Sequence, residues 1–273
     1  MTRFAACFLS VFSDVAFGGM VAISIPPFFK IERGFYKSSA GVYLAAALLS
    51  VFGLSALALR GSQGGPPSQP WLWMLAGIWL VFCLFCALYM LTLWNDNGYV
   101  RSRAYSAALL SGLVAVSANA ISLVPTGLGL IAAVAYVLSA VFSSIVLGLA
   151  SAGMLFGHWY LIDPNLPVDY LRTLVRALGY ALLGYLGVLV VTLAVIVMTS
   201  GNAGTLLGSS WILLTLRFVL GPIASVILAW MTWQTLKIPQ TMAATGLLYI
   251  ATMSVLVGEF LGRFIMFRTA IPL

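Results

Sequence analysis

Long apolar segments alternate along the chain with short polar or Gly/Pro-rich breaks. Each apolar segment spans about 20 residues or more, which is the length an α-helix needs to cross a bilayer. The pattern therefore predicts an all-α protein with about eight transmembrane helices. We expect them at about residues 4–27, 39–59, 71–94, 104–124, 128–156, 170–199, 208–235 and 241–267. The first is expected to end at Pro26-Pro27, because paired prolines terminate a helix.

The breaks between these segments are too short to hold a second domain. The longest runs from Gly61 to Pro70, and its Gly, Pro, Ser and Gln residues are typical of a flexible connector. Asp14 lies inside the first apolar run and no small-residue cleavage site follows, so that run is not expected to be a cleaved signal peptide. We expect a single transmembrane domain over residues 1–273.

Composition agrees with a lipid-facing surface. Only 7% of the residues are charged and 62% are hydrophobic, with a mean hydropathy of +1.09, whereas soluble domains hold about 25% charged residues. The net charge of +7 therefore does not indicate a nucleic-acid partner, since basic loop residues orient helices and contact anionic lipid.

The distribution of basic residues predicts the orientation in the membrane. Three of them, Arg3, Arg60 and Arg268, fall on the side of the termini. Because cytoplasmic loops are enriched in Lys and Arg, both termini are expected outside the cytoplasm. The eight basic residues on the opposite side are Lys30, Arg33, Lys37, Arg101, Arg103, Arg172, Arg176 and Lys237.

The chain has few side chains that could bind a metal ion or a redox cofactor. Cys83 and Cys86 form a CxxC, but it lies in the middle of an apolar segment without a second ligand pair. His158 is the only histidine, so the chain cannot build a bis-histidine haem alone. We expect no haem, iron–sulfur cluster or metal ion bound by this chain alone.

Four charged residues lie inside the expected helices: Asp14, Arg217, Glu259 and Arg263. An ionisable group in hydrocarbon is costly unless it is paired or hydrated. Counted along their helices, Asp14, Arg217 and Glu259 lie at about 12–15 Å depth, with Arg263 one turn shallower on the face of Glu259. The first, seventh and eighth helices are therefore expected to pack around a charge-balanced cluster. Such a cluster either locks the helices together or lines a pocket for a quinone head group or a proton relay.

His158 begins a second candidate site, in the connector of residues 157–167 that is expected after the fifth helix. An imidazole side chain is suited to hydrogen-bond a quinone carbonyl or to pass a proton. Alternatively, Trp159 and Tyr160 make this segment an interfacial anchor closed by the Asp163-Pro164 turn. Both interpretations stay open.

The segment Gly258-Glu259-Phe260-Leu261-Gly262-Arg263 resembles the C-terminal Gly-Glu-Leu-Ile-Gly-Arg segment of the DMSO reductase membrane anchor. That anchor belongs to the NrfD-like superfamily, with the anchors of polysulfide and nitrite reductases. The opening 11–20, with its Gly-Gly pair, and Leu216-Arg217-Phe218 look similar too, so the resemblance covers about 70 residues at the two ends of the chain.

The resemblance implies two four-helix bundles, a quinone or menaquinone site, and partner subunits that carry iron–sulfur clusters and the catalytic centre. One departure concerns the histidine that DMSO-reductase-type members have after the second helix. The corresponding stretch here, residues 54–61, has none. The fold can thus be shared while the quinone site is moved or lost.

Three functions remain open. The first is a membrane anchor subunit of a quinone-linked oxidoreductase complex in a bacterial-type inner membrane, with the polar pocket formed by Asp14, Arg217, Glu259 and Arg263, and His158 as a separate candidate. The second is a ligand-free structural subunit of a respiratory or photosynthetic complex, which the missing histidine favours.

The third function is a small-solute transporter. Transporters tend to have internal repeats and broken helices, whereas no repeat is convincing here and Gly221-Pro222 is the one candidate break. A stand-alone enzyme is not expected, because the sequence shows no nucleophile–base set and no phosphate-binding loop.

Overall fold

The computed structural model describes residues 2–60, 69–124, 129–163, 165–200, 211–238 and 240–269. Within these ranges the chain forms eight helical spans long and apolar enough to cross a membrane, so the all-α, multi-pass membrane fold is confirmed. The first six spans are α1 (Thr2–Ala22), α2 (Arg33–Leu59), α3 (Gln69–Thr92), α4 (Gly98–Leu123), α5 (Leu130–Ile162) and α6 (Val168–Ser200). The seventh consists of α8 (Trp211–Phe218), a π-helical turn η1 (Val219–Ile223) and α9 (Ala224–Lys237), and the eighth is α10 (Thr241–Thr269).

The ends of several helices differ from the sequence-based expectation. α1 ends at Ala22, one turn before the prolines, because the amides of Ser24 and Ile25 bond to carbonyls three residues back and tighten the last turn. α5 continues to Ile162, so residues 157–162 are helical and do not form a connector. α2 and α4 begin about six residues earlier than expected, and their first turns therefore carry basic side chains.

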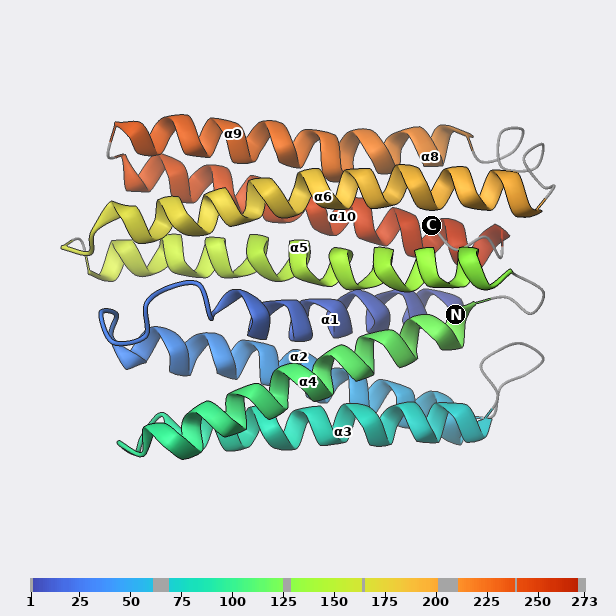
Figure 1. The fold of residues 1–273 in the computed structure, drawn as a ribbon, viewed down its shortest axis with the longest axis horizontal. Coiled ribbons are helices and arrows are strands. Elements are labelled where there is room, and N and C mark those ends of the chain that lie inside the picture. The colour runs from blue at the N-terminus through green and yellow to red at the C-terminus, as the bar shows by residue number, and fades with distance from the viewer. Residues whose placement is uncertain are drawn as a thin grey trace.

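The spans form two four-helix bundles placed side by side. In the first, α1 packs against α2 and α4, and α3 packs against α2 and α4. In the second, α5 packs against α6 and α10, and α9 packs against the same two helices. α1 and α5 join the bundles along their lengths, and α1 begins at the same end of the molecule at which α10 ends (Figure 1).

The two bundles repeat one arrangement. Exchanging α1 with α5, α2 with α6, α3 with the seventh span and α4 with α10 maps the main helix contacts onto one another. The contact of α1 with α10 thereby corresponds to that of α5 with α4. The sequence contains a matching local repeat, since Val11-Phe12-Ser13 precedes Gly18 with the spacing by which Val141-Phe142-Ser143 precedes Gly148. This repeat was not predicted from the sequence.

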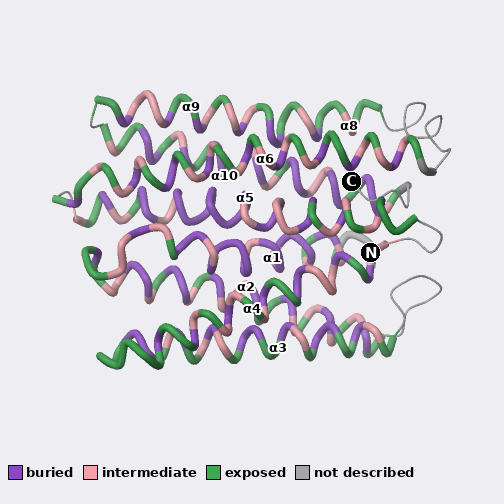
Figure 2. The backbone as a smooth tube through the Cα atoms, in the orientation of Figure 1, coloured by how far each residue is buried: buried purple, intermediate pink, exposed green. Residues whose placement is uncertain are grey.

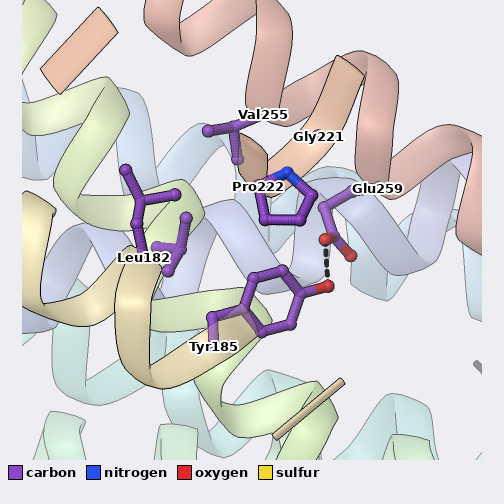
Figure 3. Close-up of a pocket in the computed structure, with 7 residues that line it drawn as sticks. Leu182, Tyr185, Gly221, Pro222, Val255 and Glu259 are labelled. Carbon is purple, nitrogen blue, oxygen red and sulfur yellow. Dashed lines mark hydrogen bonds between the residues drawn. The ribbon is translucent and has the colours of Figure 1, made fainter. Parts of the chain in front are cut away.

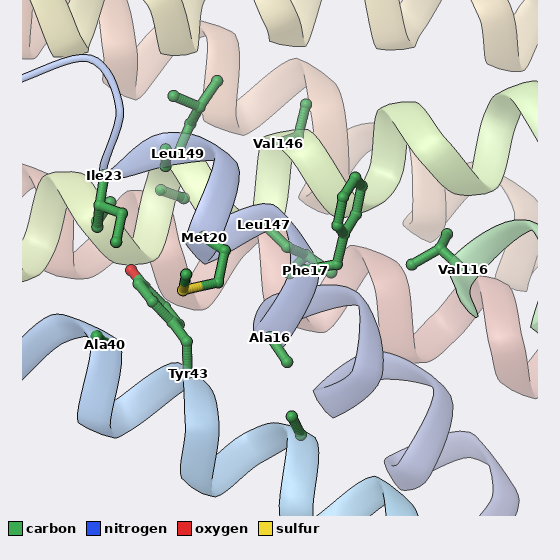
Figure 4. Packing of buried hydrophobic residues seen from close by; sticks show 14 of the residues in the cluster. Ala16, Phe17, Met20, Ile23, Ala40, Tyr43, Val116, Val146, Leu147 and Leu149 are labelled. Atoms are coloured by element: carbon green, nitrogen blue, oxygen red, sulfur yellow. The ribbon is translucent and has the colours of Figure 1, made fainter. Parts of the chain in front are cut away.

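The core lies along α1 and α5. Figure 2 shows buried residues concentrated on these two helices, while exposed residues follow α3 and α9 at the outer sides. Phe17 and Met20 of α1 point among side chains of α2, α4 and α5 (Figure 4). The two central helices approach at Gly18 and Gly148, where a Cβ on either glycine would overlap the backbone of the other helix. Small residues permit such close packing in membranes.

Candidate functional site

The structure brings together the four charged residues of the expected cluster. Asp14, Arg217, Glu259 and Arg263 are each at most 4% exposed, and they come from α1, α8 and α10. Two carboxylates and two guanidinium groups balance in formal charge, which lowers the cost of holding them away from water. The cluster has two arms.

The first arm is an ion pair between α1 and α10. Nη2 of Arg263 lies 2.6 Å from Oδ2 of Asp14, and its Nη1 donates to the Tyr136 hydroxyl of α5 at 2.8 Å. Ser144 of α5 donates to the other carboxylate oxygen of Asp14 at 2.9 Å. The Tyr136 hydroxyl in turn lies 3.0 Å from the sulfur of Met266. This arm connects the two bundles.

The second arm runs through a buried phenol. Nη2 of Arg217 donates to the Tyr185 hydroxyl at 3.0 Å, and Tyr185 donates to Oε1 of Glu259. Ser143 of α5 donates to Oε2 of Glu259 at 2.6 Å, and Nη1 of Arg217 donates to the Gly258 carbonyl at 3.1 Å. Arg217 and Glu259 thus interact through Tyr185, and the structure records no direct ion pair between them among its described residues.

The neighbouring residues Ser143 and Ser144 link the two arms, because one bonds to Glu259 and the other to Asp14. Neither these serines nor Tyr136 and Tyr185 were predicted from the sequence as members of the site. A signal existed, since paired serines and a tyrosine inside apolar helices place hydroxyl groups where water cannot satisfy them. Their spacing alone does not show which charge they contact.

Glycines of α10 make room for Arg217. A Cβ on Gly262 would overlap Nη1 and Cζ of Arg217, so the guanidinium lies directly across that glycine. A Cβ on Gly258 would overlap Cα of Gly221 in η1, so the seventh span and α10 touch backbone to backbone. The Gly-x-x-x-Gly spacing around Glu259 therefore makes room for the Arg217 guanidinium and lets the seventh span contact α10 closely.

An apolar crevice reaches the Glu259 end of the cluster. It holds about 160 Å³ of empty space, part of it open to the surroundings, and is lined by Val146, Leu182, Tyr185, Gly221, Pro222, Val255 and Glu259. Tyr185 and Glu259 point toward each other across it, with the Pro222 ring beside them (Figure 3). The crevice is too narrow for a water molecule in this conformation. Any ligand there requires the lining to move.

The π-helical turn is the irregular part of this lining. Residues 219–223 contain Pro222, whose nitrogen carries no proton and cannot donate to the preceding turn. Ser254 of α10 donates its hydroxyl to the Leu220 carbonyl and so satisfies one acceptor of the turn. Single π-helical turns often occur at functional sites. The candidate break at Gly221-Pro222 is thus a π-helical turn within a continuous span.

His158 does not join the cluster. It lies exposed in the last turns of α5, toward the end opposite the start of α1, whereas Arg217, Glu259 and Arg263 lie in the half of their spans that is nearer the start of α1. Cys83 and Cys86 are buried free thiols in α3. No group of three or more His, Cys, Asp or Glu residues that could hold a metal ion occurs in the part of the chain that the structure describes.

The cluster offers three kinds of chemistry. It holds buried carboxylates that can exchange a proton, phenol hydroxyl groups that can relay one, and guanidinium donors for a carbonyl oxygen. The Nε atoms of Arg217 and Arg263 are buried without a hydrogen-bond partner among the described residues.

No protein-family model matches the chain, and no curated protein or solved structure matches it. A function must therefore be inferred from the positions of the buried charged and hydroxyl side chains.

Proposed function

We propose that the chain is the membrane anchor subunit of a quinone-linked oxidoreductase complex of a bacterial-type inner membrane. Its quinone head-group site is the Glu259–Tyr185 end of the buried cluster. Iron–sulfur and catalytic subunits of the complex carry the electron chemistry, because the described residues supply no ligand set for a redox metal. The resemblance of residues 258–263 to anchors of this kind supports the proposal.

One observation carries the proposal. A buried carboxyl and a buried phenol, those of Glu259 and Tyr185, stand hydrogen-bonded at one end of an otherwise apolar crevice. Ligand sites commonly combine apolar walls with a few polar groups that fix orientation. Leu182, Val255 and Val146 are suitable neighbours for a ring and an isoprenoid tail, and Tyr185 and Glu259 suit its oxygen atoms.

The roles of the residues follow from their contacts. A bound quinol would supply two electrons to the partner's iron–sulfur clusters and two protons. Glu259 would accept one proton at the carboxylate oxygen that Tyr185 now occupies, and Tyr185 would donate to the head-group oxygen that has lost it. The other proton would pass from the second hydroxyl group of the ring to water. Arg217 holds the phenol in place through its Nη2 atom. The Asp14–Arg263 arm anchors α10 from the side of the first bundle.

Entry to the crevice requires the lining to open. The π-helical turn is the suitable place, because Pro222 removes one backbone hydrogen bond there and Val219, Leu220 and Ile223 are exposed on the lipid-facing side. Outward movement of this turn separates Pro222 from Glu259 without breaking the Asp14–Arg263 pair. The site thus opens toward lipid, where quinones dissolve.

A transporter is the second candidate, and the repeated arrangement of the two bundles favours it. Repeats related by an axis along the membrane normal occur in transporters, as do interrupted helices. It is the weaker candidate because the buried charges bond to one another and the crevice beside them, in the described part of the chain, is too narrow for a water molecule. A transporter is expected to work alone in liposomes, whereas an anchor subunit needs its partners.

The first test is extraction of the protein from its native membrane in mild detergent, followed by mass spectrometry of subunits and quinone. The proposal predicts stoichiometric iron–sulfur partners and about one quinone per complex. A protein isolated alone and active in solute uptake would overturn it. If partner subunits are found but no quinone, the chain is better explained as a ligand-free structural subunit.

The second test compares Glu259→Gln with Glu32→Gln, a matched change at an exposed position at the start of α2. We expect Glu259→Gln to assemble with its partners but to lose quinol oxidation and most of the bound quinone, while Glu32→Gln keeps both. If Glu259 only locks helices, the amount of assembled complex falls and the complex that does assemble turns over normally.

A further inference from the structure

A second polar site lies at the end of the first bundle, distant from the buried cluster. It is formed by the turn after α1, the first turns of α2 and α4, and the turn between α3 and α4. Residues 28–37 and 94–103 hold five basic side chains and two acidic ones. We name Lys30, Arg33, Lys37, Arg101 and Arg103 the basic cluster.

Most of these cations pack on aromatic rings and not on carboxylates. Nζ of Lys37 lies 4.4 Å from the ring centre of Trp94, and the guanidinium of Arg103 lies 4.1 Å from that of Tyr99. The single ion pair in this region of the described structure joins Arg33 to Asp96 at 2.5 Å. The other cations therefore keep donors for an external anion.

Arg101 is the most informative member of the basic cluster. Only 8% of the residue is exposed, yet among the described residues its guanidinium has one hydrogen bond, at 3.3 Å to the Asn95 carbonyl, and it stacks 4.4 Å from the Phe28 ring. No carboxylate lies within ion-pair distance of it among the described residues. A largely buried guanidinium without a counter-ion is costly, and a phosphodiester offers the paired oxygens that guanidinium groups bind.

The surface beside the basic cluster indicates what carries the phosphate. Leu84, Leu88 and Leu91 of α3 are exposed and follow one another at helical spacing up to Trp94. They form an apolar row on one face of the helix, ending at the ring that Lys37 covers. A soluble anion gains nothing from such a row, whereas an acyl chain lies along it. Trp94 and Tyr99 are themselves exposed, as aromatic residues at a membrane interface usually are.

We propose that the basic cluster binds an anionic glycerophospholipid. Lys37 and Arg101 contact the phosphodiester and Arg103 contacts the distal part of the head group, while an acyl chain follows the leucine row of α3. Asp96 opposes this binding by charge, and because Arg33 donates a hydrogen bond to its carboxylate and attracts its charge, the pKa of Asp96 is lowered and the residue stays ionised. This site stands independently of the quinone proposal.

The test is native mass spectrometry of the purified protein with dioleoyl phosphatidylglycerol or dioleoyl phosphatidylcholine at equal concentration. We expect selective retention of phosphatidylglycerol. Lys37→Gln and Arg103→Gln should each lower that retention about fivefold, since a cation near an anionic lipid surface contributes about that factor. Asp96→Asn should raise it. Arg176→Gln is the matched control, because Arg176 also stacks on a tryptophan, Trp233, but in the second bundle.

Two results would overturn the proposal. One is equal retention of the two lipids by the wild type, or retention that neither Lys37→Gln nor Arg103→Gln changes. The other is loss of a co-purifying acidic subunit from Lys37→Gln with lipid retention unchanged, which would assign the basic cluster to a protein partner. Both tested side chains lie at the surface end of their helices, so folding is expected to survive, and the melting temperature of each variant checks this.

Discussion

Asp14 and Arg263 are separated by 249 residues in sequence and form an ion pair at 2.6 Å between α1 and α10. The pair fastens the first bundle to the last helix of the second. Each side chain is less than 6% exposed, so neither charge can be solvated if its partner is removed. The pair therefore helps to fix the position of the two bundles relative to each other.

Removing one charge of this pair should destabilise the protein more than removing both. Asp14→Asn and Arg263→Gln are each expected to lower the free energy of unfolding by about 3–5 kcal/mol, because a buried charge is left alone. The double variant should lose less than either single variant, because it leaves no buried charge without its partner. Thermal unfolding in detergent, followed by size-exclusion chromatography, measures this coupling. Additive losses would show that the two side chains act separately.

Tyr185→Phe tests the phenol that joins Arg217 to Glu259. The change removes the acceptor for Nη2 of Arg217 and the donor to Glu259, and it should destabilise the protein by about 1–3 kcal/mol. Tyr180→Phe on the same helix is the control, because Tyr180 is 74% exposed. A Tyr185→Phe variant as stable as the Tyr180→Phe variant would contradict the assigned hydrogen bonds.

Gly262→Ala should displace Arg217. A methyl group at this position overlaps the guanidinium, so the arginine loses its bonds to Tyr185 and Gly258. We expect a loss of at least about 1–3 kcal/mol, the usual cost of overpacking. Gly246→Ala on the same helix has no neighbour within 4 Å and should be neutral or stabilising by up to about 1 kcal/mol. The difference in melting temperature between these variants is the measurement.

Gly148→Ala should separate the two central helices. Its methyl group meets the backbone of Gly18, which cannot turn aside as a side chain can. The expected result is a large fall in the yield of folded protein, whereas Gly187→Ala of α6, which points into open space, should leave it unchanged. Equal yields of the two variants would show that α1 and α5 do not approach each other most closely at Gly18 and Gly148.

The effect of pH on lipid binding follows from Asp96. Its pKa lies below the ordinary value of 3.8, so its ion pair with Arg33 persists above that value and is lost only as the pH falls through the lowered pKa. Retention of phosphatidylglycerol should therefore stay constant between about pH 5 and about pH 8, where Lys and Arg also keep their charge. A fall in retention over that interval would assign the binding to a histidine or another titrating group.

Much of the fold could be predicted because the bilayer sets the length of each span. Counting depth along helices also placed Asp14, Arg217 and Glu259 at one level, where the structure brings them together. The partners of these charges were harder to predict. Serine and tyrosine are tolerated in apolar helices for many reasons, and nothing in the spacing showed that Ser143, Ser144 and Tyr185 face the cluster.

The helix ends and the repeat were missed for different physical reasons. Polar residues such as His158 were assigned to a connector, although long or amphipathic side chains allow a helix to continue into the interface. The repeat escaped notice because its sequence match is confined to about ten residues around Gly18 and Gly148. Only the shared order of helix contacts makes it plain.

The exchange of the two bundles has a consequence for the charge between them. Asp14 and Ser144 occupy equivalent positions, four residues before Gly18 and Gly148, and their side chains touch at 2.9 Å. Any residue at this place meets its own counterpart. Aspartate at both positions would set carboxylate against carboxylate beside Arg263 alone, where like charges repel and one must remain protonated. The difference between aspartate and serine at this one pair lets two similarly arranged bundles meet at α1 and α5 with one carboxylate at the contact and a hydroxyl group opposite it.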